Sequence, residues 1–134
     1  MNIKKKDLQL RTKSFAIFVI KFVMSLKQYS PTDVISKQLL RSSTSVGANY
    51  RAACRARSTA DFISKMGIVE EEIDESIYWF ELLVECNIIE YDSIKPLLLE
   101  ANELLSIIVA SIKTAKKNKR KLIRIPQSEI PIPN

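Results

Sequence analysis

Histidine is absent from this chain, and glycine and cysteine occur only twice each. Without histidine there is no Ser–His or Cys–His nucleophile pair, and the Glu-x-x-His ligands of di-iron helix bundles are excluded as well. The two glycines, Gly47 and Gly67, are too far apart to form a glycine-rich phosphate-binding loop. Cys54 and Cys86 stand alone, which indicates buried free thiols rather than a disulfide framework or a zinc site.

The remaining residues offer little for catalysis. Glu72 and Glu75 form an E-x-x-E pair, for which ion pairs with arginine or a solvated surface are simpler interpretations than a carboxylate-only metal site. No grouping of lysine, tyrosine and carboxylate residues points to a reaction either. We therefore expect a protein that is not an enzyme and that holds no metal and no cofactor.

Long apolar runs are also missing. Lys4, Lys5 and Lys6 precede an apolar run at residues 15–20, as in a signal peptide, but Lys21 interrupts the run and no small-x-small cleavage site follows. No stretch reaches the ~18 apolar residues of a membrane-spanning helix. We expect a cytoplasmic protein with no membrane partner.

Charge is abundant, and it is sorted along the chain. Residues 1–60 carry 12 Lys/Arg and 2 Asp/Glu, residues 61–104 carry 2 and 12, and residues 105–134 carry 7 and 1. These blocks net +10, −10 and +6, which sum to the +6 of the whole chain. Such a chain is complementary to itself, to a second copy or to an anionic partner.

Apolar residues recur with the spacing of amphipathic helices in four segments, at residues 8–29, 35–53, 62–83 and 94–115. The first two breaks, at residues 30–33 and 58–61, have the composition of helix starts, and the third break lies at residues 87–93. Pro96 falls in the first turn of the last segment, where proline is tolerated. The pattern predicts an all-α fold, an antiparallel up-down-up-down four-helix bundle over residues 1–118, followed by a basic and then Ile/Pro-rich tail over residues 119–134.

Seven apolar side chains are expected to point into the core of this bundle: Phe22, Leu39, Val46, Ile73, Phe80, Leu105 and Ile108. We call the row of positions that faces the core the seam of a segment. The seam of the second segment is unusual, because Ser42, Asn49 and Ala53 stand where larger apolar residues are common. Small residues permit a close approach of helices, whereas a buried Asn49 needs a hydrogen-bond partner. We expect that partner to be Glu72 or a backbone carbonyl.

Two outer faces carry opposite charge. The second segment has a basic face that includes Arg41, Thr44, Ala48 and Arg51, and the third has an acidic face that includes Glu71, Glu75, Tyr78 and Leu82. Either face alone is explained by solvation. Two faces that complement each other favour a contact between copies, which closes into a ring or grows into a filament. In that contact Arg41 would pair with a carboxylate of the next subunit.

A signature in the second segment matches the pattern Q-x-x-R…S-[IV]-x-x-N through Gln38, Arg41, Ser45, Val46 and Asn49. The third segment adds two further motifs, Arg57-Ser58-x-x-Asp61-Phe62-x-x-Lys65 and Glu72-x-x-Glu75-x-x-Tyr78-Trp79. Through these motifs residues 15–115 resemble a bacterial four-helix-bundle family, the proteins encoded by intervening sequences within 23S rRNA genes. The resemblance implies a homopentameric ring. It also implies kinship with accessory proteins of diversity-generating retroelements, which bind a reverse transcriptase and nucleic acid.

Two functions fit this sequence. The first is a non-enzymatic, oligomeric nucleic-acid-binding or ribonucleoprotein scaffold, which contacts the phosphates of RNA or DNA through its basic ends. The residues expected to make these contacts are Lys4, Lys5, Lys6, Lys113, Lys116, Lys117, Lys119, Arg120, Lys121 and Arg124. The second is a protein-interaction hub that binds a polymerase or reverse transcriptase without touching nucleic acid. Alternatively, the basic ends are merely solvated.

Overall fold

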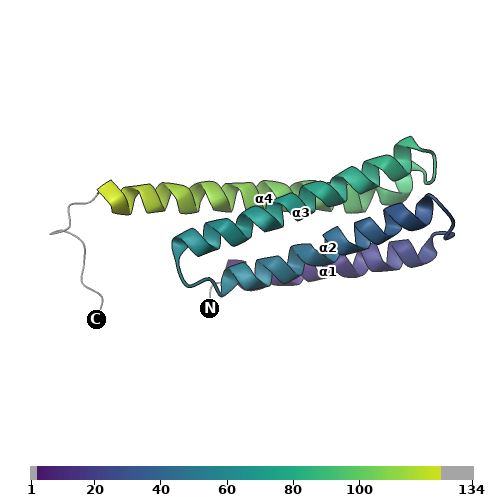
Figure 1. Cartoon of the computed structure of the whole chain (residues 1–134). Coiled ribbons are helices and arrows are strands. Elements are labelled where there is room, and N and C mark those ends of the chain that lie inside the picture. The colour runs from purple at the N-terminus through teal and green to yellow at the C-terminus, as the bar shows by residue number, and fades with distance from the viewer. Residues whose placement is uncertain (1–2, 125–134) are drawn as a thin grey trace.

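Four long helices make up the described part of the protein, which in this computed structural model is residues 3–124, with side chains described for residues 5–122. In chain order they are α1 Ile3–Ser25, α2 Thr32–Cys54, α3 Thr59–Glu85 and α4 Tyr91–Arg124. Successive helices run antiparallel and pack side by side (Figure 1). The predicted all-α, up-down-up-down four-helix bundle is confirmed.

Short polar sequences start the second and third helices, as their composition predicts. α2 begins at Thr32, directly after Pro31. α3 follows Ser58, whose Oγ accepts a hydrogen bond of 3.0 Å from the backbone N–H of Asp61. This bond satisfies one of the N–H groups that the start of a helix leaves without a partner. It defines where the turn between α2 and α3 ends.

The end of α3 is closed by backbone hydrogen bonds. Asn87 takes the left-handed conformation, with φ 58°. Its N–H donates to the carbonyl of Val84, and the N–H of Ile88 donates to the carbonyl of Leu83, both at 3.0 Å. This is the Schellman pattern, which satisfies carbonyl groups at the end of a helix. The predicted break after α3 is therefore present.

That break is shorter than the sequence pattern indicates, because α4 already begins at Tyr91. Pro96 consequently lies in the second turn of α4 and not in the first, as predicted. A proline there cannot donate to the carbonyl four residues earlier, which belongs to Asp92. The helix nevertheless continues through this position to Arg124.

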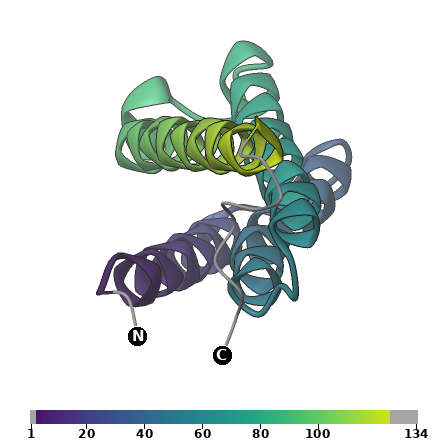
Figure 2. The same ribbon diagram turned by 90° about the vertical axis from the view of Figure 1, so that its left-hand side faces the viewer.

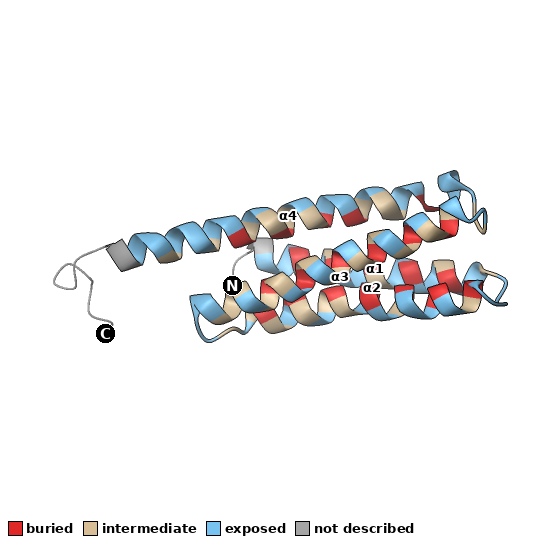
Figure 3. Ribbon diagram, turned by 45° about the horizontal axis from the view of Figure 1, so that its top comes forward, coloured by how far each residue is buried: buried red, intermediate tan, exposed pale blue. Residues whose placement is uncertain are grey.

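The core follows the predicted seam closely in the middle of the chain. Leu39, Val46, Ile73, Phe80 and Ile108 are fully buried, as expected (Figure 3).

Phe22 and Leu105 are only half-buried, and their neighbours Val23 and Leu104 take the core positions instead. An α-helix has 3.6 residues per turn, so a strict 3.5-residue seam drifts by ~20° per heptad. That drift is only about 40° by Phe22, less than the ~100° between neighbouring residues. Val23 follows and Leu104 precedes the predicted position, so the buried stripe of each helix is wider than the predicted seam, and packing decides which neighbour is buried more deeply.

α1 and α4 pack least closely of the neighbouring helix pairs (Figure 2). The guanidinium of Arg11 bridges them, with its Nη2 2.6 Å from Glu100 Oε1 and its Nε 3.2 Å from Glu100 Oε2. Glu103 Oε1 lies 3.4 Å from the same Nη2. The hydrogen bond to Glu100 is the main cause of a raised pKa for Arg11. Sequence reasoning did not predict this contact.

α4 is the longest helix, with 34 residues, and its C-terminal part extends beyond the other three (Figures 1 and 3). Its last buried side chain among those described is Ile112. Residues 119–124, which the sequence analysis assigned to a tail, continue α4 as helix. The predicted Ile/Pro-rich part of that tail lies outside the described residues. We refer to residues 113–124 as the basic segment.

Candidate functional site

The basic residues of the two predicted binding segments lie at one end of the bundle. α1 begins and α4 ends at this end (Figure 1). Lys5 lines a groove together with Thr114, Ala115 and Asn118, which shows that the two segments are neighbours. The fold thus brings together residues that are more than a hundred positions apart in sequence.

Most of these basic side chains are exposed. Lys5 and Lys6 are exposed on α1, Lys119 is half-buried, and the exposed residues of the basic segment are Lys113, Lys116, Lys117, Arg120 and Lys121. Lys4 and Arg124 lie within helices, but their side chains fall outside the described set. Exposed cationic side chains of this kind are the groups that contact phosphates.

No ion pair neutralises the basic segment among the described side chains, whose ion pairs all involve other residues. The sequence between Glu103 and Glu129 contains no acidic residue at all. Seven Lys/Arg residues therefore stand in a stretch of 12 without a carboxylate. Asp7 of α1 lines the same groove as Lys5, so a single carboxylate there opposes the seven positive charges of the basic segment and leaves this end positive.

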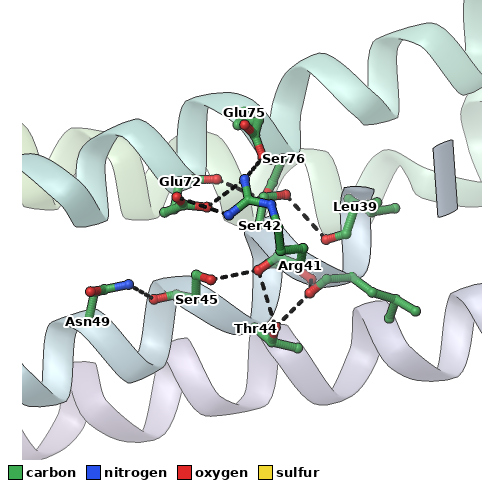
Figure 4. A network of polar contacts seen from close by, with 11 residues as sticks. Leu39, Arg41, Ser42, Thr44, Ser45, Asn49, Glu72, Glu75 and Ser76 are labelled. Atoms are coloured by element: carbon green, nitrogen blue, oxygen red, sulfur yellow. Dashed lines mark hydrogen bonds and ion pairs between the residues drawn. The ribbon is translucent and has the colours of Figure 1, made fainter. Parts of the chain in front are cut away.

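Arg41, which the sequence analysis placed at a subunit contact, forms ion pairs within its own chain (Figure 4). Its Nη1 donates to Glu72 Oε1 at 3.4 Å, its Nη2 lies 3.3 Å from Glu72 Oε2, and its Nη2 also donates to Glu75. The charge of Glu72 is the main cause of a raised pKa for Arg41. Glu72 and Glu75 thus form ion pairs with arginine, which was one of the simpler interpretations of their E-x-x-E spacing.

The rest of the predicted basic face lines a groove between α1 and α2. Thr44, Ala48 and Arg51 contribute from α2, and Lys6 and Leu10 from α1, to a groove of ≈ 440 Å³. This arrangement adds α1 residues that the sequence analysis did not assign to a subunit contact.

Gly47 lies in the same groove and brings the two helices close together. A Cβ at this position would lie 3.4 Å from the backbone carbon of Thr12. That distance leaves little room for a larger side chain, so Gly47 allows α2 to approach the backbone of α1 closely at this position.

The predicted acidic face is found on α3, with its members in different surroundings. Glu71 and Tyr78 are exposed, whereas Leu82 is half-buried and packs against the core. Glu75 is turned toward Arg41 of the same chain. Glu71 and Tyr78 are therefore the members of this face that remain available to another molecule.

Asn49 makes a simpler hydrogen bond than an interhelical one. Its Nδ2 donates to the backbone carbonyl of Ser45, one turn earlier in α2, at 2.8 Å (Figure 4). It is half-buried and does not bond to Glu72. Of the two predicted partners, Glu72 and a backbone carbonyl, the second is the one observed. Because this carbonyl belongs to α2 itself, the bond does not join two helices.

A buried polar contact joins α2 to α3, in addition to the ion pairs of Arg41, and lies between Ser42 and Ser76, whose hydroxyl oxygens are 2.9 Å apart (Figure 4). Both side chains are fully buried. The sequence signal was available, because both serines occupy seam positions on adjacent helices.

The thiols differ from the expectation. Cys54 is half-buried, and Cys86 is exposed at the end of α3, so the prediction of buried thiols is wrong for Cys86. Its position just beyond the last residue of α3 explains the difference, because the seam has already ended at Leu83. Tyr50 is buried, and burial is the main cause of the raised pKa of its hydroxyl.

Within residues 3–124 no helix is both long and apolar enough to cross a lipid bilayer. The described residues also contain no group of three or more histidine, cysteine, aspartate or glutamate side chains arranged to hold a metal ion.

Comparison with known proteins identifies relatives of the bundle. The sequence model of the 23S rRNA-intervening sequence protein family matches residues 5–110. A crystal structure from Bacteroides thetaiotaomicron, of a protein of unknown function from the S23 ribosomal protein family, is similar with a TM-score of 0.72 and 32% sequence identity. That similarity covers 79% of this chain and 98% of the other. No curated protein matches. On this evidence the chain belongs to the 23S rRNA-intervening sequence protein family.

Proposed function

We propose that this protein is a non-enzymatic nucleic-acid-binding scaffold that holds phosphates at the basic end of its bundle. The observation that carries the proposal is that Lys5 lines one groove with residues of the basic segment, whose 12 residues contain seven Lys/Arg and no carboxylate. Among the described side chains, Asp7 is the one acidic residue that lines this groove. Contacts to phosphates supply most of the affinity in sequence-independent binding. The proposal therefore needs neither a base-reading loop nor a catalytic group.

The proposal includes assembly into a homo-oligomer, for which a pentamer is the expectation from family resemblance. The groove between α1 and α2 offers Arg51 and Lys6 beside the small residues Thr44 and Ala48. Glu71 and Tyr78 on α3 offer an acidic and partly apolar surface of matching character. Two different faces that complement each other join copies head to tail, and such contacts form rings when the rotation closes. A ring would present several basic ends at once, which strengthens binding to a long polyanion.

A titration of RNA binding against salt tests this proposal. The full chain is compared with a chain that ends at Thr114, which keeps every described core residue but lacks most of the basic segment. We expect weaker binding and a shallower dependence on salt for the shorter chain, because fewer counterions are released. Equal binding by both chains, or no binding by either at low salt, would contradict the proposal.

A second candidate function, a protein-interaction hub, is favoured by one observation. α1 exposes a row of apolar side chains, Leu10, Ile17, Ile20 and Met24, on a surface away from the core. Exposed apolar rows of this kind commonly mark binding sites for other proteins. A polymerase or a reverse transcriptase is the partner that the family resemblance suggests, and its capture without any nucleic acid would favour this function over the first.

A further inference from the structure

We propose that the ligand of the basic segment is double-stranded rather than single-stranded nucleic acid, held through its phosphates by a preformed helix. This inference rests on the proposed function and narrows it to one class of ligand. It concerns residues beyond the family match, which ends at residue 110, before Lys113.

The first observation is that the basic segment is helical throughout. α4 is continuous from Tyr91 to Arg124, so the helix itself fixes the spacing of the charges. Lys113, Lys117 and Arg120 are separated by four and three residues, which corresponds to rises of about 6 and 4.5 Å along the helix axis. Position 124 of the helix continues the same row, so the row spans about 16 Å along the helix axis from position 113 to position 124.

The second observation is the direction of this row. At 100° per residue, positions 113, 117, 120 and 124 fall within about 60° of one another, and well away from the positions of Ile108 and Ile112. Ile108 and Ile112 are buried, whereas Lys113, Lys117 and Arg120 are exposed. The row therefore faces away from the bundle and is accessible to a large ligand.

The third observation concerns aromatic rings on which bases could stack. At this end of the bundle an aromatic side chain, Phe62, lies beside the basic segment, but it is half-buried in the groove with Lys5 and Asn118 rather than exposed. Proteins that hold single strands combine a basic groove with aromatic stacking platforms. The large aromatic side chains exposed in the described part of the chain are Phe18, Tyr29, Tyr78 and Tyr91.

All four lie away from the basic end. Tyr29 lies between α1 and α2, and Tyr91 is the first residue of α4. Phe18 and Tyr78 lie in the C-terminal halves of α1 and α3. α1 and α3 both end, and α4 begins, at the end of the bundle opposite to the basic segment (Figure 1). A single strand at the basic segment would therefore gain phosphate contacts with little stacking, and would forgo the stacking contribution that other single-strand-binding proteins add to those contacts.

The charge density of a duplex also favours it as the ligand of a rigid row of positive charges. Duplex DNA carries one phosphate charge per ~1.7 Å of axis, whereas each strand by itself carries one per ~3.4 Å. A duplex offers these charges on a stiff surface, so a helix whose charges are already aligned meets them without further ordering. A flexible single strand must be ordered as it binds.

Direct measurement of affinity tests the inference. Dissociation constants of the full chain are measured for an RNA duplex, a DNA duplex and a single strand of the same length, all at ~0.15 M salt. We expect at least one duplex to bind about tenfold more tightly than the single strand, because it offers more phosphates to the same row. The RNA and DNA duplexes then show whether either backbone is preferred.

A helix-breaking variant tests whether the preformed helix is the cause. Asn118→Pro keeps every charge but interrupts α4 within the basic segment, at an exposed position beyond the last buried residue. The matched control is Asn118→Ala, which preserves the helix. We expect Asn118→Pro to weaken duplex binding about tenfold and to leave binding of the single strand nearly unchanged, with a melting temperature equal to that of the control.

The outcomes separate this inference from the proposed function. A duplex preference that Asn118→Pro abolishes supports both. Equal or tighter binding of the single strand, or a duplex preference that survives Asn118→Pro, overturns the inference and leaves the proposed function standing. The absence of binding to any of the three ligands at low salt overturns both.

Discussion

Ser42 of α2 and Ser76 of α3 share a fully buried hydrogen bond, with their hydroxyl oxygens 2.9 Å apart. Ser76 Oγ also lies 2.9 Å from the carbonyl of Glu72, and Ser42 Oγ lies 3.2 Å from that of Leu39. One hydroxyl can therefore donate across the interface while the other donates to its own helix. The pair links the two helices at the point where small side chains let them approach.

A double-mutant cycle measures this link. Ser42→Ala, Ser76→Ala and the double variant are compared by urea unfolding. Each single change should lower the free energy of unfolding by about 1 kcal/mol, and the coupling between the two should be about 0.5–1.5 kcal/mol. Additive effects would show that the two hydroxyls contribute through their own helices only.

The position of the α4 seam gives a second prediction. Leu104 is fully buried, whereas its neighbour Leu105 is half-buried. Leu104→Ala should lower the free energy of unfolding by about 2–5 kcal/mol, in the range of other core truncations, because it leaves a cavity. Leu105→Ala is the matched control, and its effect should be clearly smaller. Equal losses for the two variants would contradict the seam described for α4.

Much of the fold is predictable from the sequence because the physical signals are local. Ser58 and the Ser-Pro step before Thr32 mark helix starts, and the seams of α2 and α3 follow from apolar spacing. The burial of Leu104 rather than Leu105 was not predictable from a 3.5-residue rhythm, since both belong to the apolar stripe of α4 and the packing of the neighbouring helices decides between them. Pro96 was placed wrongly because the helix start at Tyr91 carries no strong capping residue.

Acid sensitivity supplies a third prediction. Lys65 Nζ donates to both carboxylate oxygens of Asp61, at 2.8 and 2.7 Å, and this hydrogen bonding is the main cause of a lowered pKa for Asp61. A lowered pKa in the folded state stabilises the fold above the ordinary carboxyl pKa, near pH 4, and that stabilisation is lost as pH falls through the folded-state value.

Thermal unfolding at two pH values checks this expectation. The melting temperature should fall less between pH 6 and pH 3 in Asp61→Asn than in the unaltered protein, because the variant has no proton to bind at this site. Asp74→Asn, at an exposed position of the same helix, serves as the control. The same fall in both variants would show that the contact between Lys65 and Asp61 does not contribute to acid sensitivity.

Assembly gives a fourth prediction, which the structure sharpens. Arg51 lines the groove between α1 and α2 and makes no ion pair among the described side chains, whereas Glu75 is paired with Arg41 of its own chain. If the groove is the subunit contact, Arg51→Glu should dissociate the oligomer more strongly than Glu75→Arg. Light scattering at micromolar concentration measures this, and a monomeric unaltered protein would contradict the proposed assembly.

The candidate site was predictable in its chemistry but not in its arrangement. Absence of histidine and the clustering of lysine and arginine are visible in the sequence, and antiparallel topology places both basic segments at one end. The intrachain contact of Arg41 with Glu72 and Glu75 depends on how α2 and α3 cross. The continuation of α4 through residues 119–124 was also missed, because charge alone does not distinguish a solvated helix from a tail.

The salt dependence of duplex binding by two charge-matched variants tests the central claim most directly. One variant removes three charges from the basic segment, Lys113→Gln, Lys117→Gln and Arg120→Gln. The other removes three exposed charges from the opposite half of the bundle, Lys21→Gln, Lys27→Gln and Lys95→Gln. Both variants have the same net charge, so a general electrostatic effect would act equally on them. We predict that the slope of log K against log salt becomes shallower by about 2–3 in the first variant only, since each phosphate contact contributes about 0.9. Equal slopes in the two variants would contradict the claim that nucleic acid binds at the basic end.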